Sequence, residues 1–240
     1  MSLAQTKIVE GNEGEAAMQA RGVRLGVDIG GTFTDIVVQT PDEGLEISKV
    51  SSTPEDPGQA VVEGVTALLD RMGIPYDAVE ENVHGTTVGS NTLLQRVGAK
   101  TGLITTKGFA DVLEIGRIRT PTMFDLSWEK PEALVPRRYR LDPDGRIAAD
   151  GSGVGPLDPE EAVAVARRLA GEGIESIALC LINSYINPAH EEAARQAIEA
   201  ALPELLVTAS YDVLPEIKEY ERTSTTVVNA YLLPAMRTYI

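Results

Sequence analysis

A short stretch near the start of the chain, RLGVDIGGTFTDIVV at residues 24–38, places polar residues and glycines inside an apolar strand pattern. Period-2 alternation puts three apolar side chains on one face of this strand and Asp28 on the other. Gly30 and Gly31 follow directly, and paired glycines let an anion approach the backbone without a Cβ in the way. The stretch therefore has the residue types of an anion-binding turn beside a carboxylate.

The chemistry that these residues suggest is the binding of a nucleotide phosphate. The backbone amides of the turn can form a concave anion nest, the threonines add hydroxyl groups, and Asp28 and Asp35 offer hard oxygens to a hydrated Mg²⁺. The predicted phosphate-binding residues are Gly30, Gly31, Thr32, Phe33, Thr34 and Asp35. The alternative is a β-hairpin that needs Gly-Gly only for its turn. The string D-x-G-G-T-x-T-D matches by chance much less often than a bare glycine pair, so it favours phosphate binding. It is neither a P-loop nor a Rossmann fingerprint.

A second polar block, HGTTVGSNTLLQR, follows at residues 84–96. We expect a strand that ends near His84 and a helix whose first turn holds Thr86 and Thr87, where free backbone amides attract a phosphoryl group or a substrate oxygen. Asn91 lies one turn further along, on the side of Thr87. These three residues are candidate catalytic groups, although helix capping alone also explains the threonines. His84 is either a general acid or base or a structural residue.

Composition limits the partners of the chain. The 240 residues carry 36 acidic against 21 basic side chains, a formal net charge of -15, which argues against nucleic acid and membrane surfaces as partners. A bound phosphate must then be held by backbone amides or a metal ion. The single cysteine, Cys180, lies in an apolar run and is interpreted as a small buried residue. With no secretory signal or membrane span in the pattern, we expect a cytoplasmic protein.

The element pattern predicts a mixed α/β fold. An antiparallel meander over residues 24–51 is followed by a helix over 57–72 that Gly73 ends, a buried strand at TGLITT and a helix at GFADVLEIG. A less regular segment, 117–147, ends in a strand at RRYRLDPDGRI. Beyond the glycine-rich residues 151–156, which are either a linker or a loop, helices and strands alternate as in a parallel sheet. A long helix closes the sequence.

Two charged groups have weaker assignments. Glu114, Arg117 and Arg119 lie at a helix exit, where arginine is suited to recognise phosphate or carboxylate, or simply to complement the helix dipole. We expect them to contact the substrate or a subunit. The hydroxyl-rich block EYERTSTTVVNAY carries Glu219, Glu221 and Arg222, which we interpret as solvated ion pairs.

The glycine string resembles the first phosphate-binding hairpin of the actin, Hsp70 and sugar-kinase superfamily. Four blocks, GVDIGGTFTDIVV, VHGTTVGSNTLLQRVGAKTGLITTKGFADVLEIGR, FDLSWEKPEALVPRR and EYERTSTTVVNAYLLP, look like the N-terminal part of the hydantoinase A and 5-oxoprolinase family, which includes the nucleotide-binding subunits of acetone and acetophenone carboxylases. The resemblance covers residues 23–240. It implies a ribonuclease-H-like nucleotide-binding lobe at 23–150, an additional α/β subdomain at 151–212 and the start of a further domain at 213–240. Residues 1–22 lack strong periodicity and turn signals, so we expect a flexible leader there.

The resemblance implies an ATP-dependent hydrolase of the hydantoinase, N-methylhydantoinase or oxoprolinase type. ATP would phosphorylate the amide oxygen of a cyclic amide before ring opening, with Asp28 orienting Mg²⁺ through its water shell. Asp35 would tune the metal or hold the hairpin. The implied partner is a hydantoinase B-like or carboxylase subunit in an oligomer. Alternatives are the nucleotide-binding subunit of a ketone carboxylase and a non-catalytic, nucleotide-dependent assembly module.

Members of this family are about three times longer than this chain, well beyond one domain on the usual length prior. The second phosphate hairpin and the adenosine-binding residues of the superfamily are not found in these 240 residues. We therefore expect a truncated chain that binds ATP weakly when alone.

Overall fold

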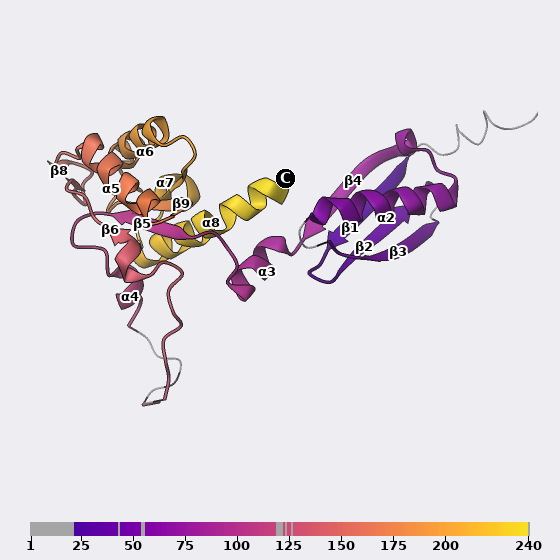
Figure 1. Cartoon of the computed structure of the whole chain (residues 1–240), viewed down its shortest axis with the longest axis horizontal. Helices are drawn as coiled ribbons and strands as arrows, with labels where there is room; N and C mark the ends of the chain where they lie inside the picture. The colour runs from indigo at the N-terminus through magenta and orange to yellow at the C-terminus, as the bar shows by residue number, and fades with distance from the viewer. Residues whose placement is uncertain are drawn as a thin grey trace, which may run out of the picture. The chain divides into compact units, whose positions relative to one another are not determined.

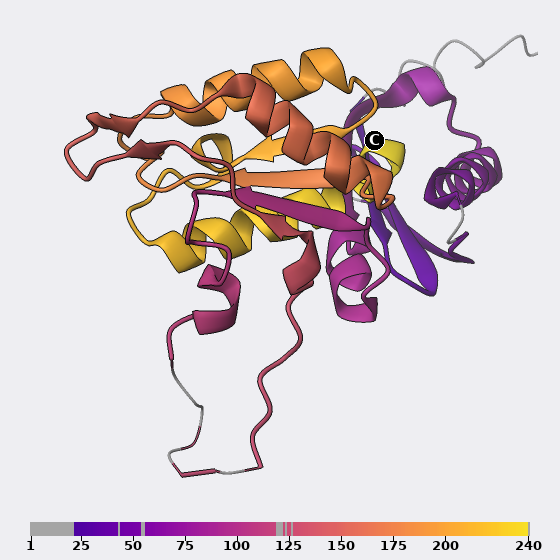
Figure 2. The same cartoon turned by 60° about the vertical axis from the view of Figure 1, so that its left-hand side comes forward.

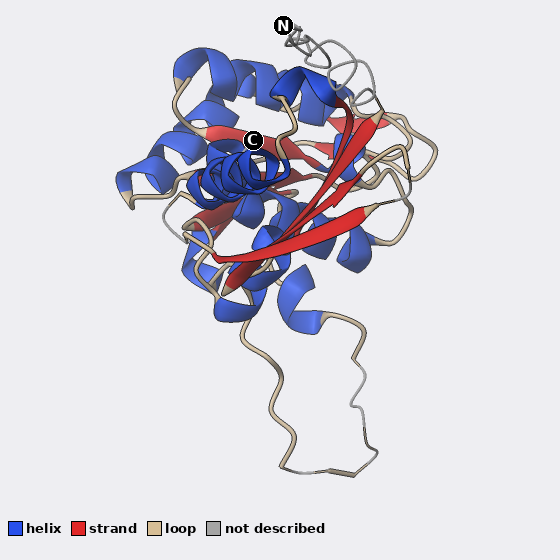
Figure 3. Ribbon diagram, turned by 90° about the vertical axis from the view of Figure 1, so that its right-hand side faces the viewer, coloured by secondary structure: helices blue, strands red, loops and turns tan. Residues whose placement is uncertain are grey.

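The computed structural model describes residues 22–239 apart from 43, 54–55, 119–121, 123 and 126. The leader expected at residues 1–22 lies outside the described residues except for its last position. The chain divides into two compact units, one formed by the chain up to Asn91 and the other by Thr92–Thr238. Each unit has its own sheet, with strands in red and helices in blue in Figure 3.

The first unit is built on a four-stranded sheet with the order β3-β2-β1-β4. Its strands are β1 (Val23–Ile29), β2 (Phe33–Gln39), β3 (Leu45–Ser51) and β4 (Val79–Thr86). The first three strands pair antiparallel, which confirms the predicted meander, and β4 pairs parallel to β1. Side chains of β1 alternate between buried and exposed along the strand, as expected for a sheet with one covered face.

One helix, α2 (Pro57–Met72), covers the core face of this sheet (Figure 1). Its sequence sets both ends: the Asp56 side chain accepts a hydrogen bond from the Gly58 N–H at the start, and Gly73 takes the left-handed conformation, with φ 67°, at the end. The buried core between helix and sheet comprises Val23, Leu25, Val27, Ile29, Ile36, Val38, Val65, Leu68, Leu69 and Ala78. The intervening residues of β1, including Asp28, therefore lie on the opposite face.

Close packing between α2 and the sheet gives a test of this core. A Cβ added at Gly64 would lie 2.4 Å from Cδ1 of the buried Ile36 and 3.2 Å from the Val50 methyls. Overpacking of this kind costs about 1–3 kcal/mol, more than the roughly 1 kcal/mol that alanine adds in helix propensity. We expect Gly64→Ala to lower the free energy of unfolding in urea. Gly171→Ala is the control, because nothing lies within 4 Å of that position in α5, and equal stabilisation by both changes would contradict the packing.

The second unit contains a four-stranded parallel sheet with the order β10-β9-β5-β6. Its strands are β5 (Thr101–Thr105), β6 (Arg140–Leu141), β9 (Ser176–Cys180) and β10 (Leu206–Ala209), and its longer helices are α5 (Pro159–Gly171), α6 (Ala189–Ala201) and α8 (Glu219–Tyr239). Figure 2 shows α5 and α6, in orange, on one side of the sheet and α8, in yellow, on the other. The predicted alternation of helices and parallel strands is confirmed.

The remaining elements are short. They are η1 (Tyr76–Ala78), α3 (Val88–Gln95), α4 (Val112–Ile115), η2 (Arg137–Tyr139), β7 (Arg146–Ile147), β8 (Gly153–Gly155) and α7 (Ser210–Val213). The helix expected at GFADVLEIG is only the single turn α4, and the strand expected at RRYRLDPDGRI is divided among η2, β6 and β7. Within the described residues, no helix is both long and apolar enough to cross a membrane.

The glycine-rich segment at residues 151–156 is a hairpin strand and not a linker. β8 pairs antiparallel with β7, and the Ala148 N–H donates to the Ser152 carbonyl across the turn. Glycine is as typical of such turns as of linkers, so composition alone did not separate the two. The compact units also differ from the expected lobes, because β5, before residue 150, shares one sheet with β9 and β10, after it.

Buried polar groups lie where β9 meets α8. Cys180 is buried, as expected, and burial raises the pKa of its thiol to about 11, which leaves it unreactive. The interpretation of Arg222 as a solvated residue is wrong, because its side chain is fully buried. Its guanidinium donates to the carbonyls of Leu181 (3.0 Å) and Glu216 (2.8 Å) and pairs with Glu219. The face of α8 that carries Arg222 is buried, and a buried charge is stable only when it has hydrogen-bond or ion-pair partners.

Candidate functional site

The turn between β1 and β2 is tight. The Gly30 N–H donates to the Phe33 carbonyl at 3.0 Å, and a Cβ added at Gly30 would lie 2.9 Å from that same oxygen. No hydrogen bond between described residues uses the N–H of Gly31 or of Thr32. Both residues are exposed, so these two successive amides are open to solvent and can take an anion.

Ser52, just after β3, holds the turn from the carbonyl side. Its N–H donates to the Thr32 carbonyl and its hydroxyl to the Gly30 carbonyl, both at 2.9 Å. The hydroxyl also lies 3.0 Å from that of Thr34. The first two of these hydrogen bonds are accepted by carbonyl oxygens of the turn, so the N–H groups of Gly31 and Thr32 stay available to a ligand.

A row of charged residues crosses the outer face of the sheet beside this turn. Asp28 stands directly opposite Asp35, which in turn stands opposite Lys49, whose Nζ lies 2.8 Å from an Asp35 carboxylate oxygen. Gly85 flanks Asp28 on β4 and adds no side chain. Like charges directly opposite each other in a sheet are destabilising. Lys49 offsets the charge of Asp35, and the exposed Asp28 carboxylate is left open to a cation at this face of the sheet.

The donor set fits a hydrated divalent ion. Carboxylate oxygens are the ligands that Mg²⁺ prefers, and Mg²⁺ usually retains several waters and takes one or two protein carboxylates beside substrate phosphates. Asp28 and Asp35 supply two carboxylates at the end of the phosphate-type turn. Among the described residues there is no cluster of three or more His, Cys, Asp or Glu side chains that would enclose an ion.

The second polar block, at the end of β4, lies beside the same turn, but its two threonines are placed differently from the prediction. The strand continues through Thr86 and α3 begins at Val88, so both threonines precede the helix. The N–H and the hydroxyl of Thr87 both donate to the Ile29 carbonyl, at 3.0 and 3.2 Å. Thr86 caps the helix, its hydroxyl accepting from the Val88 N–H at 3.1 Å. β-pairing with β1 extends the strand past Gly85, where the local sequence suggested a loop.

Asn91 lies beside the glycine turn. Its Nδ2 donates to the Thr87 hydroxyl at 3.1 Å and lies 3.0 Å from the position that a Cβ of Gly31 would take. Since β1 and β4 are parallel neighbours, their carboxyl ends meet at one edge of the sheet, where ligands bind in open α/β sheets. Asp28, Gly31, Thr87 and Asn91 are therefore brought together as one group.

The side chains of Thr34 and Phe33 have other contacts, and phosphate binding by the Phe33 amide stays a prediction. Thr34 is fully buried on the α2 face, and its hydroxyl is engaged with Ser52, so its side chain supports the turn from beneath. Phe33 is 47% exposed, with its ring centroid 5.3 Å from the Lys49 ammonium nitrogen. Lys49 and Ser52 are the members of the group that the sequence did not identify, although period-2 alternation of β3 with the neighbouring strands places Lys49 on the Asp28 face.

Comparison with known proteins identifies the family of the chain. Residues 24–202 match the model of the hydantoinase/oxoprolinase N-terminal region. The chain belongs to the hydantoinase/oxoprolinase family. The caprolactamase subunit alpha of Pseudomonas jessenii is 38% identical over 229 residues, which are 93% of this chain and 33% of that subunit. The chain thus spans about a third of the length of the relatives that it matches.

Solved structures show the same fold. The crystal structure of the ATP-dependent caprolactamase from Pseudomonas jessenii matches with a TM-score of 0.81 and 37% identity over 90% of this chain and 32% of that one. The nucleotide-free structure of an ATP-dependent acetone carboxylase also matches with a TM-score of 0.81, at 28% identity over 89% of this chain and 32% of that one. These matches confirm the expected fold class, an α/β nucleotide-binding lobe.

The other candidates of this family member have the following surroundings. His84 pairs with Val27 and precedes Gly85 on β4, so alternation places its side chain on the face opposite Asp28. In the second unit, Arg117 forms an ion pair with Glu221 at 2.5 Å, and Glu114 lies 3.7 Å from the buried Arg140. Arg119 lies outside the described residues. Contacts of these residues with a substrate or a subunit stay a prediction.

Proposed function

We propose that this chain is the ATP-handling part of an enzyme that phosphorylates the amide oxygen of a cyclic amide, a hydantoin or a lactam, before ring opening. The observation that carries the proposal is the pair of unsatisfied amides at Gly31 and Thr32 beside two opposed carboxylates. The names of its relatives support ATP as the phosphoryl donor, since the caprolactamase and the acetone carboxylase are both ATP-dependent. Caprolactam is a cyclic amide.

In this proposal each residue of the group has a defined task. The amides of Gly31 and Thr32 bind the terminal phosphates, and Ser52 and Thr34 keep the turn rigid. Asp28, with Asp35, would hold Mg²⁺ through its water shell, and the ion would supply charge neutralisation. Thr87 and Asn91 orient the transferred group at the strand edge; catalysis is then positioning and electrostatic stabilisation, as in phosphoryl transfer generally.

The reaction balances as follows. The amide oxygen attacks the γ-phosphorus of ATP, the bond to the β-phosphate oxygen breaks, and ADP leaves. Water adds to the ring carbon and the carbon–nitrogen bond breaks, the nitrogen taking a proton, which gives an acyl phosphate. A second water attacks the acyl carbon, and phosphate leaves with the original amide oxygen. Phosphorylation thus turns a poor leaving group into a good one.

A partner subunit completes the reaction in this account. The relative from Pseudomonas jessenii is named subunit alpha, which supports an assembly of unlike subunits. The proposed partner is a hydantoinase B-like subunit that carries out ring opening. The second candidate function is the nucleotide-binding role in a ketone carboxylase, which the acetone carboxylase match favours. In that role the phosphorylated atom is the enol oxygen of a ketone.

The two candidate functions, and a non-catalytic assembly role, separate in one assay. The protein at its natural full length, with its partner subunit, is mixed with ATP and Mg²⁺, and ADP release is followed. We expect release to rise when a hydantoin or lactam is added. Stimulation by a ketone with bicarbonate indicates the carboxylase, and ATP binding without stimulation by any of these compounds contradicts an enzymatic role.

Ser52 provides a test of the turn itself. Ser52→Ala removes the hydroxyl that holds the Gly30 carbonyl, so the amides of the turn lose their fixed direction. Because small displacements of positioning groups have large effects, we expect the KM for ATP to rise roughly tenfold in ADP-release assays. Ser51→Ala, at an exposed position next along the chain, is the control. An unchanged KM in a folded Ser52→Ala protein would show that the turn does not depend on this bond.

A further inference from the structure

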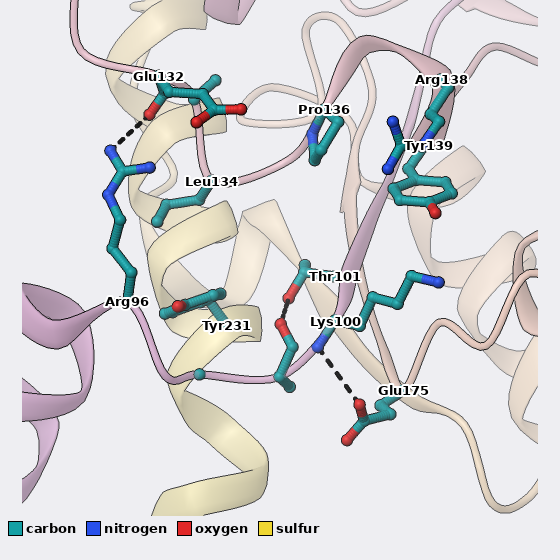
Figure 4. Close-up of a pocket in the computed structure, with 13 residues that line it drawn as sticks. Arg96, Lys100, Thr101, Glu132, Leu134, Pro136, Arg138, Tyr139, Glu175 and Tyr231 are labelled. Carbon is teal, nitrogen blue, oxygen red and sulfur yellow. Dashed lines mark hydrogen bonds between the residues drawn. The ribbon is translucent and has the colours of Figure 1, made fainter.

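The second unit contains a cavity of about 430 Å³ that has no part in the proposed phosphoryl transfer. Its size falls in the range of small-molecule sites, roughly 300–1,000 Å³. The lining combines the start of β5, the turn η2, the residue before β9 and one residue of α8 (Figure 4). The charged and aromatic lining residues are Arg96, Lys100, Glu132, Arg138, Tyr139, Glu175 and Tyr231.

Positive charge in this cavity is not compensated by ion pairs. No ion pair between described residues includes Arg96, Lys100 or Arg138. Arg96 donates to the Glu132 carbonyl at 2.7 Å, and Lys100 donates to a backbone carbonyl as well. Three cations face two glutamates here, in a chain whose net charge is -15. A local excess of positive charge in such an acidic protein attracts anions.

Two of these cations flank one aromatic ring. The Lys100 ammonium nitrogen lies 4.9 Å from the centroid of the Tyr139 ring, and the Arg138 guanidinium carbon lies 4.6 Å from it. Hydrogen bonds from Arg138 and then from Lys100 lower the pKa of the Tyr139 phenol. Both cations lie within 5 Å of one ring centroid, so a single anion at the edge of this ring can be attracted by both.

The backbone gives the cavity a defined wall. Gly98 lies against Tyr231 so closely that a Cβ at residue 98 would be 2.2 Å from the ring, and the Ala99 N–H donates to the Tyr231 carbonyl at 3.1 Å. Arg96 is in the left-handed region, with φ 56°, which is uncommon for a residue other than glycine. Strained backbone of this kind persists where the surroundings fix it, often at binding sites.

We propose that this cavity binds a small doubly charged anion, a phosphate or a dicarboxylate, beside Lys100 and Arg138 with the Tyr139 hydroxyl as a further donor. Arginine and lysine are the residues that recognise both oxyanions, Arg138 through its planar fork and Lys100 as a point charge. The glutamates at the rim, Glu132 and Glu175, select against larger polyanions. The site shares no residue with the glycine turn.

Titration calorimetry on the protein at its natural full length tests the proposal. The probes are inorganic phosphate and succinate, with chloride at the same ionic strength as the reference. We expect at least one dianion to bind at least tenfold more tightly than chloride. If only phosphate or only succinate binds in this way, that result identifies the chemical class of the ligand. Lys100→Gln and Arg138→Gln should each weaken that binding roughly tenfold or more.

A matched control lies next to the site. Arg137 belongs to η2, like Arg138, but pairs with Asp111 and does not line the cavity, so Arg137→Gln should leave dianion binding unchanged. Tyr139→Phe keeps the ring and removes only the donor, and we expect weaker binding with an unchanged melting temperature. Failure of both dianions to bind above chloride, or binding that survives both Lys100→Gln and Arg138→Gln, would overturn the proposal. The second result would place a bound phosphate elsewhere, for example at the glycine turn.

Discussion

Asp28→Asn is expected to lower ATP turnover by about a hundredfold or more while leaving the fold intact. Removal of one preorganised group that stabilises developing charge typically costs a factor of this size. Asn keeps the shape of the side chain and removes its charge. Among the described residues Asp28 has no side-chain hydrogen bond or ion pair to lose, and the residue that faces it across the strands is another carboxylate, Asp35. Activity should therefore fall without a fall in stability.

The measurement compares kcat for substrate-stimulated ADP release with the urea midpoint of unfolding. Asp70→Asn, the same change at an exposed position of α2, is the matched control and should leave both unchanged. Activity like that of the wild-type protein in Asp28→Asn would remove Asp28 from the metal site. A large loss of stability would instead assign it a structural role.

Arg222→Met is expected to lower the free energy of unfolding by about 3–5 kcal/mol, the range for removing one partner of a buried ion pair. The change leaves the half-buried Glu219 carboxylate without its cation, and the carbonyls of Leu181 and Glu216 without their donors. Met retains much of the side-chain volume, so the loss reflects the missing polar partners more than a cavity. Most single substitutions cost far less.

Arg117→Met is the matched control for this prediction. It removes the same kind of charge from an ion pair with Glu221 that is partly exposed, and such pairs contribute little to stability. Urea unfolding of both variants should separate them clearly. A loss for Arg222→Met no larger than that for Arg117→Met would mean that the buried network is not a stabilising feature.

The part of the site that the sequence predicted is the part governed by local geometry. Alternation along β1 placed Asp28 away from the core, and the paired glycines indicated the turn; both follow from residues within one strand and one loop. The meander and the approximate ends of α2 were predicted for the same reason, since Pro57 and Gly73 act on neighbouring backbone groups.

What the sequence did not predict depends on contacts between distant segments. Ser52 reaches the turn from another strand, 22 residues from Gly30, and pairing with β1 continues β4 through Gly85. Arg222 appears charged and solvated in the sequence, and only the packing of α8 on β9 buries it. Thr34 was assigned to phosphate by its motif, whereas the alternation that exposes Asp28 also turns Thr34 towards the core.

The central claim is that the chain's phosphate turn serves phosphoryl transfer to the amide oxygen of a cyclic amide. Its most direct test uses a lactam or hydantoin labelled with ¹⁸O at the carbonyl that is opened, with the full-length protein, its partner subunit, ATP and Mg²⁺. The account predicts that the label appears in inorganic phosphate, because the phosphorylated oxygen leaves with phosphorus. Label retained entirely in the carboxylate product would contradict this route, in which water attacks the acyl carbon and phosphate leaves with the labelled oxygen.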